Sequence, residues 1–141
     1  MERDCGVWIN ILAHKMKKRL NATFSDMEVT GVQSQIMHYI IRRSESAPVF
    51  QRDVEEAFSL SRSTATGILQ LLEKNGIIRR NRVENDGRLK SLLPTEKAVR
   101  INAQVHAGIR EMEAAMTRGI SAGQMQLFLE TAARMSDNLD D

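Results

Sequence analysis

Residues 51–95 read QRDVEEAFSLSRSTATGILQLLEKNGIIRRNRVENDGRLKSLLPT, and this stretch decides the fold. Its first eight residues, 51–58, place apolar side chains on one side and charged side chains on the other, which predicts a short helix. Ser61 is a suitable N-cap for a second helix, because a serine hydroxyl accepts a hydrogen bond from a free N–H of the first turn. This helix is expected to run to Lys74 and to stop at Gly76, since glycine readily adopts the left-handed C-terminal conformation.

Two strand-like runs follow the second helix, over residues 77–83 and 89–93. Asn85-Asp86-Gly87 between them has the residue types of a hairpin turn. Two short helices followed by a hairpin are the order of parts in a winged helix-turn-helix, which places its second helix in the DNA major groove. We therefore predict a mostly α (α+β) fold: a winged helix-turn-helix with long N- and C-terminal dimerisation helices.

Helical patterns flank this module on both sides. One helix is predicted over residues 7–25, and a second begins at Thr30, where the segment TGVQ has the spacing of a capping box. Thr95 caps a long helix whose apolar stripe is close to a heptad repeat. Ser121 begins a last helix, and five of its side chains are expected to face inward: Met125, Phe128, Leu129, Ala132 and Met135.

These patterns divide the chain into two regions. Residues 30–94 are interpreted as the winged helix-turn-helix DNA-binding domain, and residues 1–29 together with 95–141 as a helical dimerisation region. The apolar seam of the long helix needs a covering surface, and the compact central module has little to spare. Helices from both ends of two chains would supply that surface, so we expect a homodimer.

The composition is that of a globular protein whose charges are separated along the chain. Charged residues make up 27% and hydrophobic residues 42% of 141, and the net charge is +2. Residues 74–90 carry six cations against two anions, whereas residues 111–141 carry six anions against two cations. A basic centre with an acidic end fits a polyanion contacted through one face.

No apolar run approaches the roughly 20 residues of a membrane span. The polar N-terminus does not resemble a signal peptide, and a cysteine count of one fits a reducing compartment, so a cytoplasmic location without membrane contact is expected.

The second helix of the module begins with the groups that a DNA-reading helix needs. Arg62, Ser63, Thr64 and Thr66 follow its N-cap. Arginine can read guanine with two hydrogen bonds, and serine or threonine hydroxyls reach phosphates or base edges. The alternative is that the serines and threonines only cap the helix. The preceding helix and the following hairpin favour DNA reading.

The hairpin adds basic residues at its end. Arg88 and Lys90 stand two residues apart, and an arginine at a wing tip can enter the narrow minor groove of A·T-rich DNA. Asp86 is placed to orient Arg88 by an ion pair. The alternative is a solvated turn with ordinary charges. The preceding strand carries Arg79, Arg80 and Arg82, which are expected to make one or two phosphate contacts. Of these three, Arg82 is predicted to contact DNA.

The chain resembles the MarR family of bacterial transcriptional regulators. The resemblance rests on LSRSTAT (60–66), LEKNGIIRR (72–80), DGRLK (86–90) and LPTEKA (93–98), with TGVQ (30–33) similar to the family's second helix. It implies a homodimer built from the terminal helices that binds a pseudo-palindromic duplex operator, usually as a repressor released by a ligand or an oxidant.

The resemblance also implies roles for single residues. Arg62, Ser63, Thr64 and Thr66 would face the major groove, and Arg88 would enter the minor groove with Asp86 bracing it. Two positions depart from the family pattern. Gly67 stands where many relatives have a basic residue, and Gly87 stands where many have a second arginine.

The sequence contains no clear sensor. His14, His38 and His106 do not include a pair at the i, i+4 spacing of a helical metal site, so no metal or cofactor is predicted, although assembly from separate helices stays open. Cys5 could sense oxidants, but it lies near the terminus beside Asp4, which disfavours the reactive thiolate. A cleft between the winged module and the dimer helices could accept a small aromatic or phenolic effector, as in similar proteins.

Two other function classes compete with the DNA-binding regulator. One is a winged-helix protein-interaction module without operator-specific DNA binding, for which the departures at Gly67 and Gly87 leave room. The other is an enzyme, which we do not expect. Catalytic triads, glycine-rich phosphate loops and paired carboxylates do not stand out from the helical pattern.

Overall fold

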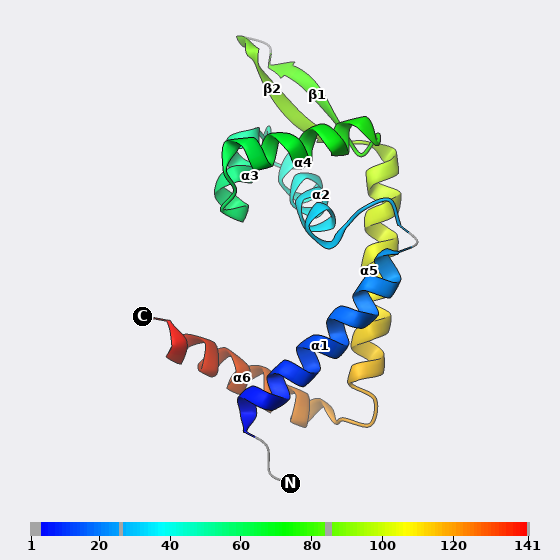
Figure 1. Ribbon diagram of the computed structural model, residues 1–141, viewed down its shortest axis with the longest axis vertical. Coiled ribbons are helices and arrows are strands. Elements are labelled where there is room, and N and C mark those ends of the chain that lie inside the picture. The colour runs from blue at the N-terminus through cyan, green and yellow to red at the C-terminus, as the bar shows by residue number, and fades with distance from the viewer. Residues whose placement is uncertain (1–3, 26, 84–85, 141) are drawn as a thin grey trace.

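The computed structural model describes residues 4–25, 27–83 and 86–140, without the side chains of residues 83 and 86–89 (Figure 1). In that part of the chain a two-stranded antiparallel sheet follows four helices and precedes two more, which confirms the predicted mostly helical winged fold. The elements are α1 (Cys5–Phe24), α2 (Gly31–Ser44), α3 (Gln51–Phe58), α4 (Arg62–Lys74), β1 (Ile78–Val83), β2 (Asp86–Pro94), α5 (Glu96–Met116) and α6 (Ala122–Leu139).

Side-chain caps fix where the helices begin. The Thr30 hydroxyl accepts from the Gln33 N–H at 3.3 Å while the Gln33 side chain accepts from the Thr30 N–H at 3.1 Å, which is the predicted capping box. The Ser61 hydroxyl caps α4 by accepting from the Thr64 N–H, and the Thr95 hydroxyl caps α5 by accepting from the Ala98 N–H. Gly76 ends α4 with a φ of +74°, in the left-handed region that favours glycine.

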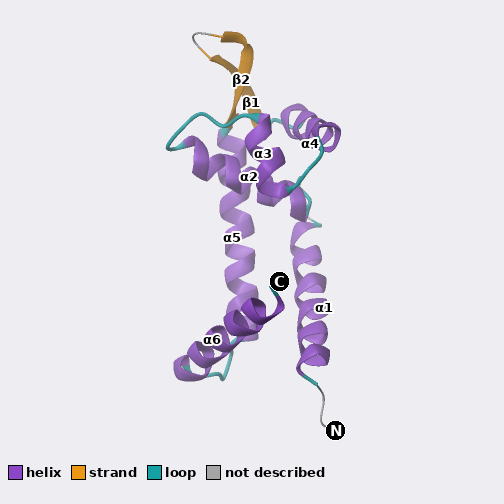
Figure 2. Ribbon diagram, turned by 90° about the vertical axis from the view of Figure 1, so that its left-hand side faces the viewer, coloured by secondary structure: helices purple, strands orange, loops and turns teal. Residues whose placement is uncertain are grey.

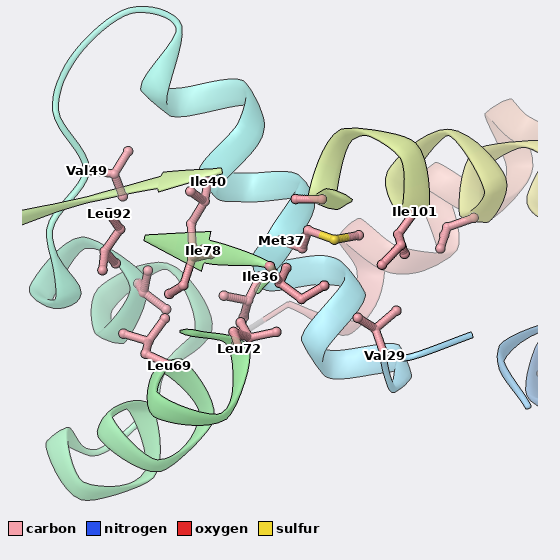
Figure 3. Close-up of a cluster of buried hydrophobic side chains, with 14 residues drawn as sticks. Val29, Ile36, Met37, Ile40, Val49, Leu69, Leu72, Ile78, Leu92 and Ile101 are labelled. Atoms are coloured by element: carbon pink, nitrogen blue, oxygen red, sulfur yellow. The ribbon is translucent and has the colours of Figure 1, made fainter. Parts of the chain in front are cut away.

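One hydrophobic core holds α2, α3, α4, the sheet and the first half of α5 together (Figure 3). Ile36 and Ile40 of α2 are fully buried and meet Leu69 and Leu72 of α4, which are also fully buried. Leu92 brings β2 into the same cluster. Burying side chains of this size contributes about 1.5–3 kcal/mol each, so the angle between α4 and the rest of the unit is held by packing rather than by loops.

The β1–β2 hairpin differs from the sequence expectation in its turn. Val83 pairs with Asp86, and the register is irregular between Arg82 and Val83. Asp86 and Gly87, predicted as turn residues, therefore belong to strand β2, because the irregular pairing continues the ladder beyond the regular register. Asn85, the third predicted turn residue, lies outside the described residues.

Two long helices carry the compact unit at one end of the molecule (Figure 2). α5 runs away from the hairpin, and α1 lies beside it, with Thr23 of α1 next to Gly108 of α5. A Cβ atom at position 108 would lie 2.6 Å from the Thr23 Cγ2 atom, so a side chain at this position would require Thr23 to move. None of the described helices is long and apolar enough to cross a membrane.

The outer helices leave much apolar surface uncovered. Neither α1 nor α6 contains a buried residue. Trp8 of α1 is 51% exposed and Leu127 of α6 is 64% exposed. The expectation that Phe128, Leu129 and Met135 face inward is wrong for the single chain, because α6 projects from the end of α5 and no described element covers it.

Candidate nucleic-acid interface

The start of α4 is a fixed and solvent-accessible group of hydroxyls. The Ser61 Oγ atom accepts from the Thr64 N–H at 3.2 Å and donates to the Thr64 Oγ1 atom at 2.9 Å. Ser63 Oγ lies 3.3 Å from the same Ser61 oxygen, and all three side chains are exposed. The capping interpretation therefore holds for Ser61, while Ser63 and Thr64 keep their outer sides accessible to a ligand.

Arg62 and Thr66 occupy different environments. Arg62, the first residue of α4, has an exposed side chain. Thr66 is half-buried against α3, where its hydroxyl accepts from the Gln51 Nε2 atom at 2.8 Å. The same Gln51 nitrogen donates to the Arg62 carbonyl at 3.3 Å. Gln51 thus ties the first turn of α4 to the start of α3, a role that the sequence pattern does not reveal.

The wing places two of its cations directly against each other. Arg82 of β1 pairs in register with Lys90 of β2, and both side chains are exposed. Directly opposed residues share one face of an antiparallel sheet, and like charges in such a pair destabilise it. An anion on this face would relieve that repulsion. The arrangement therefore suits contact with a polyanion better than free solvent.

The other arginines of β1 are engaged locally. Arg80 lies 3.6 Å from the Glu73 carboxylate of α4 and is half-buried. Arg79 donates from Nη1 to the Asn81 Oδ1 atom at 3.1 Å. Of the three strand arginines, Arg82 alone has no hydrogen-bond or ion-pair partner within the described part of the chain, and its contact with DNA stays a prediction.

The predicted wing-tip contact lies partly outside the described residues. The backbones of Asp86 and Arg88 belong to β2, but the structure does not describe their side chains. The proposed bracing of Arg88 by Asp86 stays a prediction. The described part of the hairpin extends beyond α4 at the same end of the molecule (Figure 1).

Lys97 supports the far end of α4. Its Nζ atom donates to the Asn75 carbonyl at 2.8 Å and forms an ion pair with Glu28, from the segment before α2. A cation at the C-terminus of a helix also interacts favourably with the helix dipole. Lys97 thereby connects α4, α5 and the loop before α2. The sequence gives no separate signal for this contact, since a lysine in the first turn of a helix is ordinarily solvated.

Two histidines from different elements meet behind the interface. The Nε2 atom of His106 on α5 lies 3.1 Å from the Nδ1 atom of His38 on α2, with ring centroids 4.7 Å apart. Both rings are half-buried. The sequence left assembly across helices open but did not place these two together. No group of three or more His, Cys, Asp and Glu suited to a metal occurs among the described residues, and Cys5 is exposed.

A pocket of about 490 Å³ lies between the winged unit and the long helices. It is open to solvent and largely apolar, with Lys17 and Gln35 among its polar groups. This is the place where the sequence predicted a cleft. Its apolar lining comes from three helices and includes Met16, Leu20 and Phe24 of α1, Val32 of α2 and Ile109 of α5.

Comparisons with known proteins agree with this geometry. A model of the MarR family matches residues 27–89. The uncharacterized HTH-type transcriptional regulator YybA of Bacillus subtilis is 28% identical over 93 residues, which span 66% of this chain and 60% of YybA. The match thus covers less than two thirds of that relative.

Solved structures share the whole fold. A mutant of MepR from S. aureus is 18% identical, covers 98% of this chain and 100% of its own, and has a TM-score of 0.85. The S. aureus MepR–DNA complex is 18% identical, covers 96% and 99%, and scores 0.77. The transcription regulator MarR from Oenococcus oeni is 28% identical, covers 95% and 99%, and scores 0.63. The Oenococcus oeni protein and YybA are transcriptional regulators, the class of function predicted for this chain.

Proposed function

We propose that this chain is a MarR-family protein that binds duplex DNA through α4 and the β1–β2 wing and regulates transcription as a homodimer. One observation carries the proposal. The exposed polar start of α4 and the directly opposed cations Arg82 and Lys90 lie at the same end of the molecule, away from the apolar outer helices. Residues 30–94 then act as the DNA-binding domain, and residues 1–29 and 95–141 as the dimerisation region.

Each part of this end has a distinct task in the proposal. Arg62, Ser63 and Thr64 at the start of α4 would meet base edges and phosphates of the major groove. Arg82 and Lys90 would contact phosphates, and Arg88 would reach the adjacent minor groove with Asp86 beside it. Phosphate contacts fix register, while groove contacts supply sequence preference.

The uncovered surface of α1 and α6 supports a homodimer. Both helices lack buried residues and expose large side chains such as Trp8 and Leu127. A second copy would cover them and would set the separation of the two α4 helices. For successive major grooves this separation must be about 34 Å, so we infer a pseudo-palindromic operator. A protein bound to its operator can block transcription without contacting any other protein, so we infer repression.

The proposal includes release from DNA by a small ligand. The pocket of about 490 Å³ between α1, α2 and α5 has the size of a small-molecule site. A ligand that binds better to a dimer with another α4 separation weakens DNA binding by linkage. S. aureus MepR has been solved bound to DNA and to ethidium bromide, which supports an aromatic effector of this kind.

Selection of binding sites from random duplex DNA, at one stated salt concentration, tests the proposal. We expect an inverted repeat with half-sites about 10 base pairs apart. The Arg62→Ala variant should lose preference for one base pair in each half-site, whereas Arg134→Ala on the exposed face of α6 should select the wild-type motif. Absence of any enriched motif, with only salt-sensitive background binding, would favour the protein-interaction module instead.

A further inference from the structure

We infer that Gln51 is a positioning residue for DNA reading: it donates to the Thr66 hydroxyl, occupies one of the two lone pairs of that oxygen, and leaves the hydroxyl proton free for an acceptor on DNA. The inference rests on the proposed function of α4. It assigns a role to a residue of α3 that does not itself belong to the reading helix, and it fixes the chemistry of the acceptor that Thr66 would meet.

Gln51 uses both protons of its side-chain amide nitrogen. The amide nitrogen has two protons, and the structure places one acceptor for each: the Thr66 Oγ1 atom at 2.8 Å and the Arg62 carbonyl at 3.3 Å. A carbonyl can only accept, so Nε2 rather than Oε1 must face α4. The Thr66 oxygen is therefore the acceptor in its bond with Gln51.

The Thr66 hydroxyl also has a proton to donate. A threonine hydroxyl inside a helix commonly donates to the carbonyl four residues earlier, which here belongs to Arg62. That carbonyl already accepts the helical N–H of Thr66 and the Gln51 amide, so both of its lone pairs are used. No other acceptor for the Thr66 hydroxyl is recorded among the described residues. The hydroxyl proton therefore points away from α3, towards the side of α4 that would face DNA in the proposed function.

The consequence is a preference in what Thr66 recognises. A threonine hydroxyl has one proton to donate and two lone pairs that can accept, and Gln51 occupies one of those lone pairs. With its proton free, Thr66 is suited to phosphate oxygens and to the N7, O6 or O4 atoms of bases. The position of Gln51 is itself well fixed, because the Asp53 carboxylate accepts from the Phe50 N–H at 2.8 Å and so anchors the start of α3.

A double-mutant cycle on the selected operator tests this inference. Gln51→Met keeps the length of the side chain but removes its donors, and Thr66→Val keeps the shape but removes the hydroxyl. We expect each change to lower operator affinity about tenfold, the effect of one lost hydrogen bond. The double variant should also lose about tenfold, because the two residues serve one contact. Thr66→Ser should restore affinity to within about twofold.

Two controls separate positioning from folding. Gln104→Met, at an exposed position of α5, should leave affinity unchanged. Thermal unfolding at a fixed protein concentration shows whether Gln51→Met has weakened the fold. If Gln51→Met lowers affinity as much in the Thr66→Val background as in wild type, the residues act independently and the inference is refuted while the proposed function stands. A wild-type protein that selects no operator would refute both.

Modified operators identify the acceptor. Replacing a purine by its 7-deaza analogue removes N7, and a methylphosphonate removes the charge of one phosphate. At one such position wild-type affinity should fall while Thr66→Val affinity stays the same. A 7-deaza effect assigns Thr66 to a base, and a methylphosphonate effect assigns it to the backbone. If wild type and Thr66→Val respond alike at every position, Thr66 does not donate to DNA.

Discussion

Single residues decide how strongly the wing attracts DNA. Arg82 and Lys90 lie opposite each other with exposed side chains, so each charge raises the free energy of the other in the unbound protein. In the proposed complex, phosphates near these side chains would reverse this effect. The same two charges would then raise the free energy of the folded protein without DNA and stabilise the complex with DNA.

Removing one of these two charges should therefore affect binding and folding in opposite directions. Arg82→Ala or Lys90→Ala should weaken binding to all duplexes and lower the slope of log affinity against log salt by about 1. Thermal stability of the free protein should stay the same or rise slightly. Fluorescence anisotropy over a salt series measures the slope. Lys18→Ala, at an exposed position of α1, is the charge-matched control, and an equal loss of slope there would contradict the assignment.

Elements were predicted well where local chemistry alone places them. Ser61 and Gly76 bound α4 as expected, because capping and the left-handed conformation depend on neighbouring residues only. The hairpin turn was predicted less well, since the irregular pairing of Val83 with Asp86 depends on the whole ladder. Contacts such as that between Gln51 and Thr66 join residues 15 apart, and no pattern in the sequence indicates them.

The crossing of α1 and α5 gives a prediction at the scale of the element. Alanine at position 108 would favour the helix by up to about 1 kcal/mol relative to glycine. Its Cβ atom, however, would lie 2.6 Å from the Thr23 methyl group, and relieving such a clash costs about 1–3 kcal/mol. We expect Gly108→Ala to destabilise the protein by about 1 kcal/mol.

The effect of Gly108→Ala on the free energy of unfolding should reverse when the Thr23 methyl group is removed. In a Thr23→Ala background, Gly108→Ala should stabilise the protein by roughly 0.5–1 kcal/mol, because only the helix preference remains. Denaturant unfolding of the four proteins at one concentration measures both effects. Equal stabilisation in both backgrounds would show that the crossing tolerates a side chain without movement.

At the scale of the whole molecule, α6 is a helix without a core of its own. Three of its apolar residues that were expected to face inward are exposed in the single chain, and Met125 and Ala132 are only half-buried, because the surface that would cover them belongs to no described element. Sequence periodicity reports that a face is apolar but not which chain covers it. This part of the fold is therefore completed in the proposed homodimer.

A charge on that face should separate the two copies. Phe128, which is 54% exposed in the single chain, would be buried in the dimer, so Phe128→Glu should shift sedimentation equilibrium towards monomer. Operator affinity should fall by a hundredfold or more, since one half-site then binds without its neighbour. Thr131→Glu, at another exposed position of α6, introduces the same charge and is the matched control. An unchanged dimer in the Phe128→Glu variant would place the interface elsewhere.

The histidine contact between α2 and α5 links the winged unit to the long helix through one hydrogen bond. When both rings are neutral, either His106 donates from Nε2 and His38 carries its proton on Nε2, or His38 donates from Nδ1 and His106 carries its proton on Nδ1. The tautomers of the two rings are thus set together, and neither can change alone without breaking the contact. The two helices share one hydrogen bond with two possible tautomeric arrangements, and ¹⁵N chemical shifts of the imidazoles with and without DNA would report which one is present.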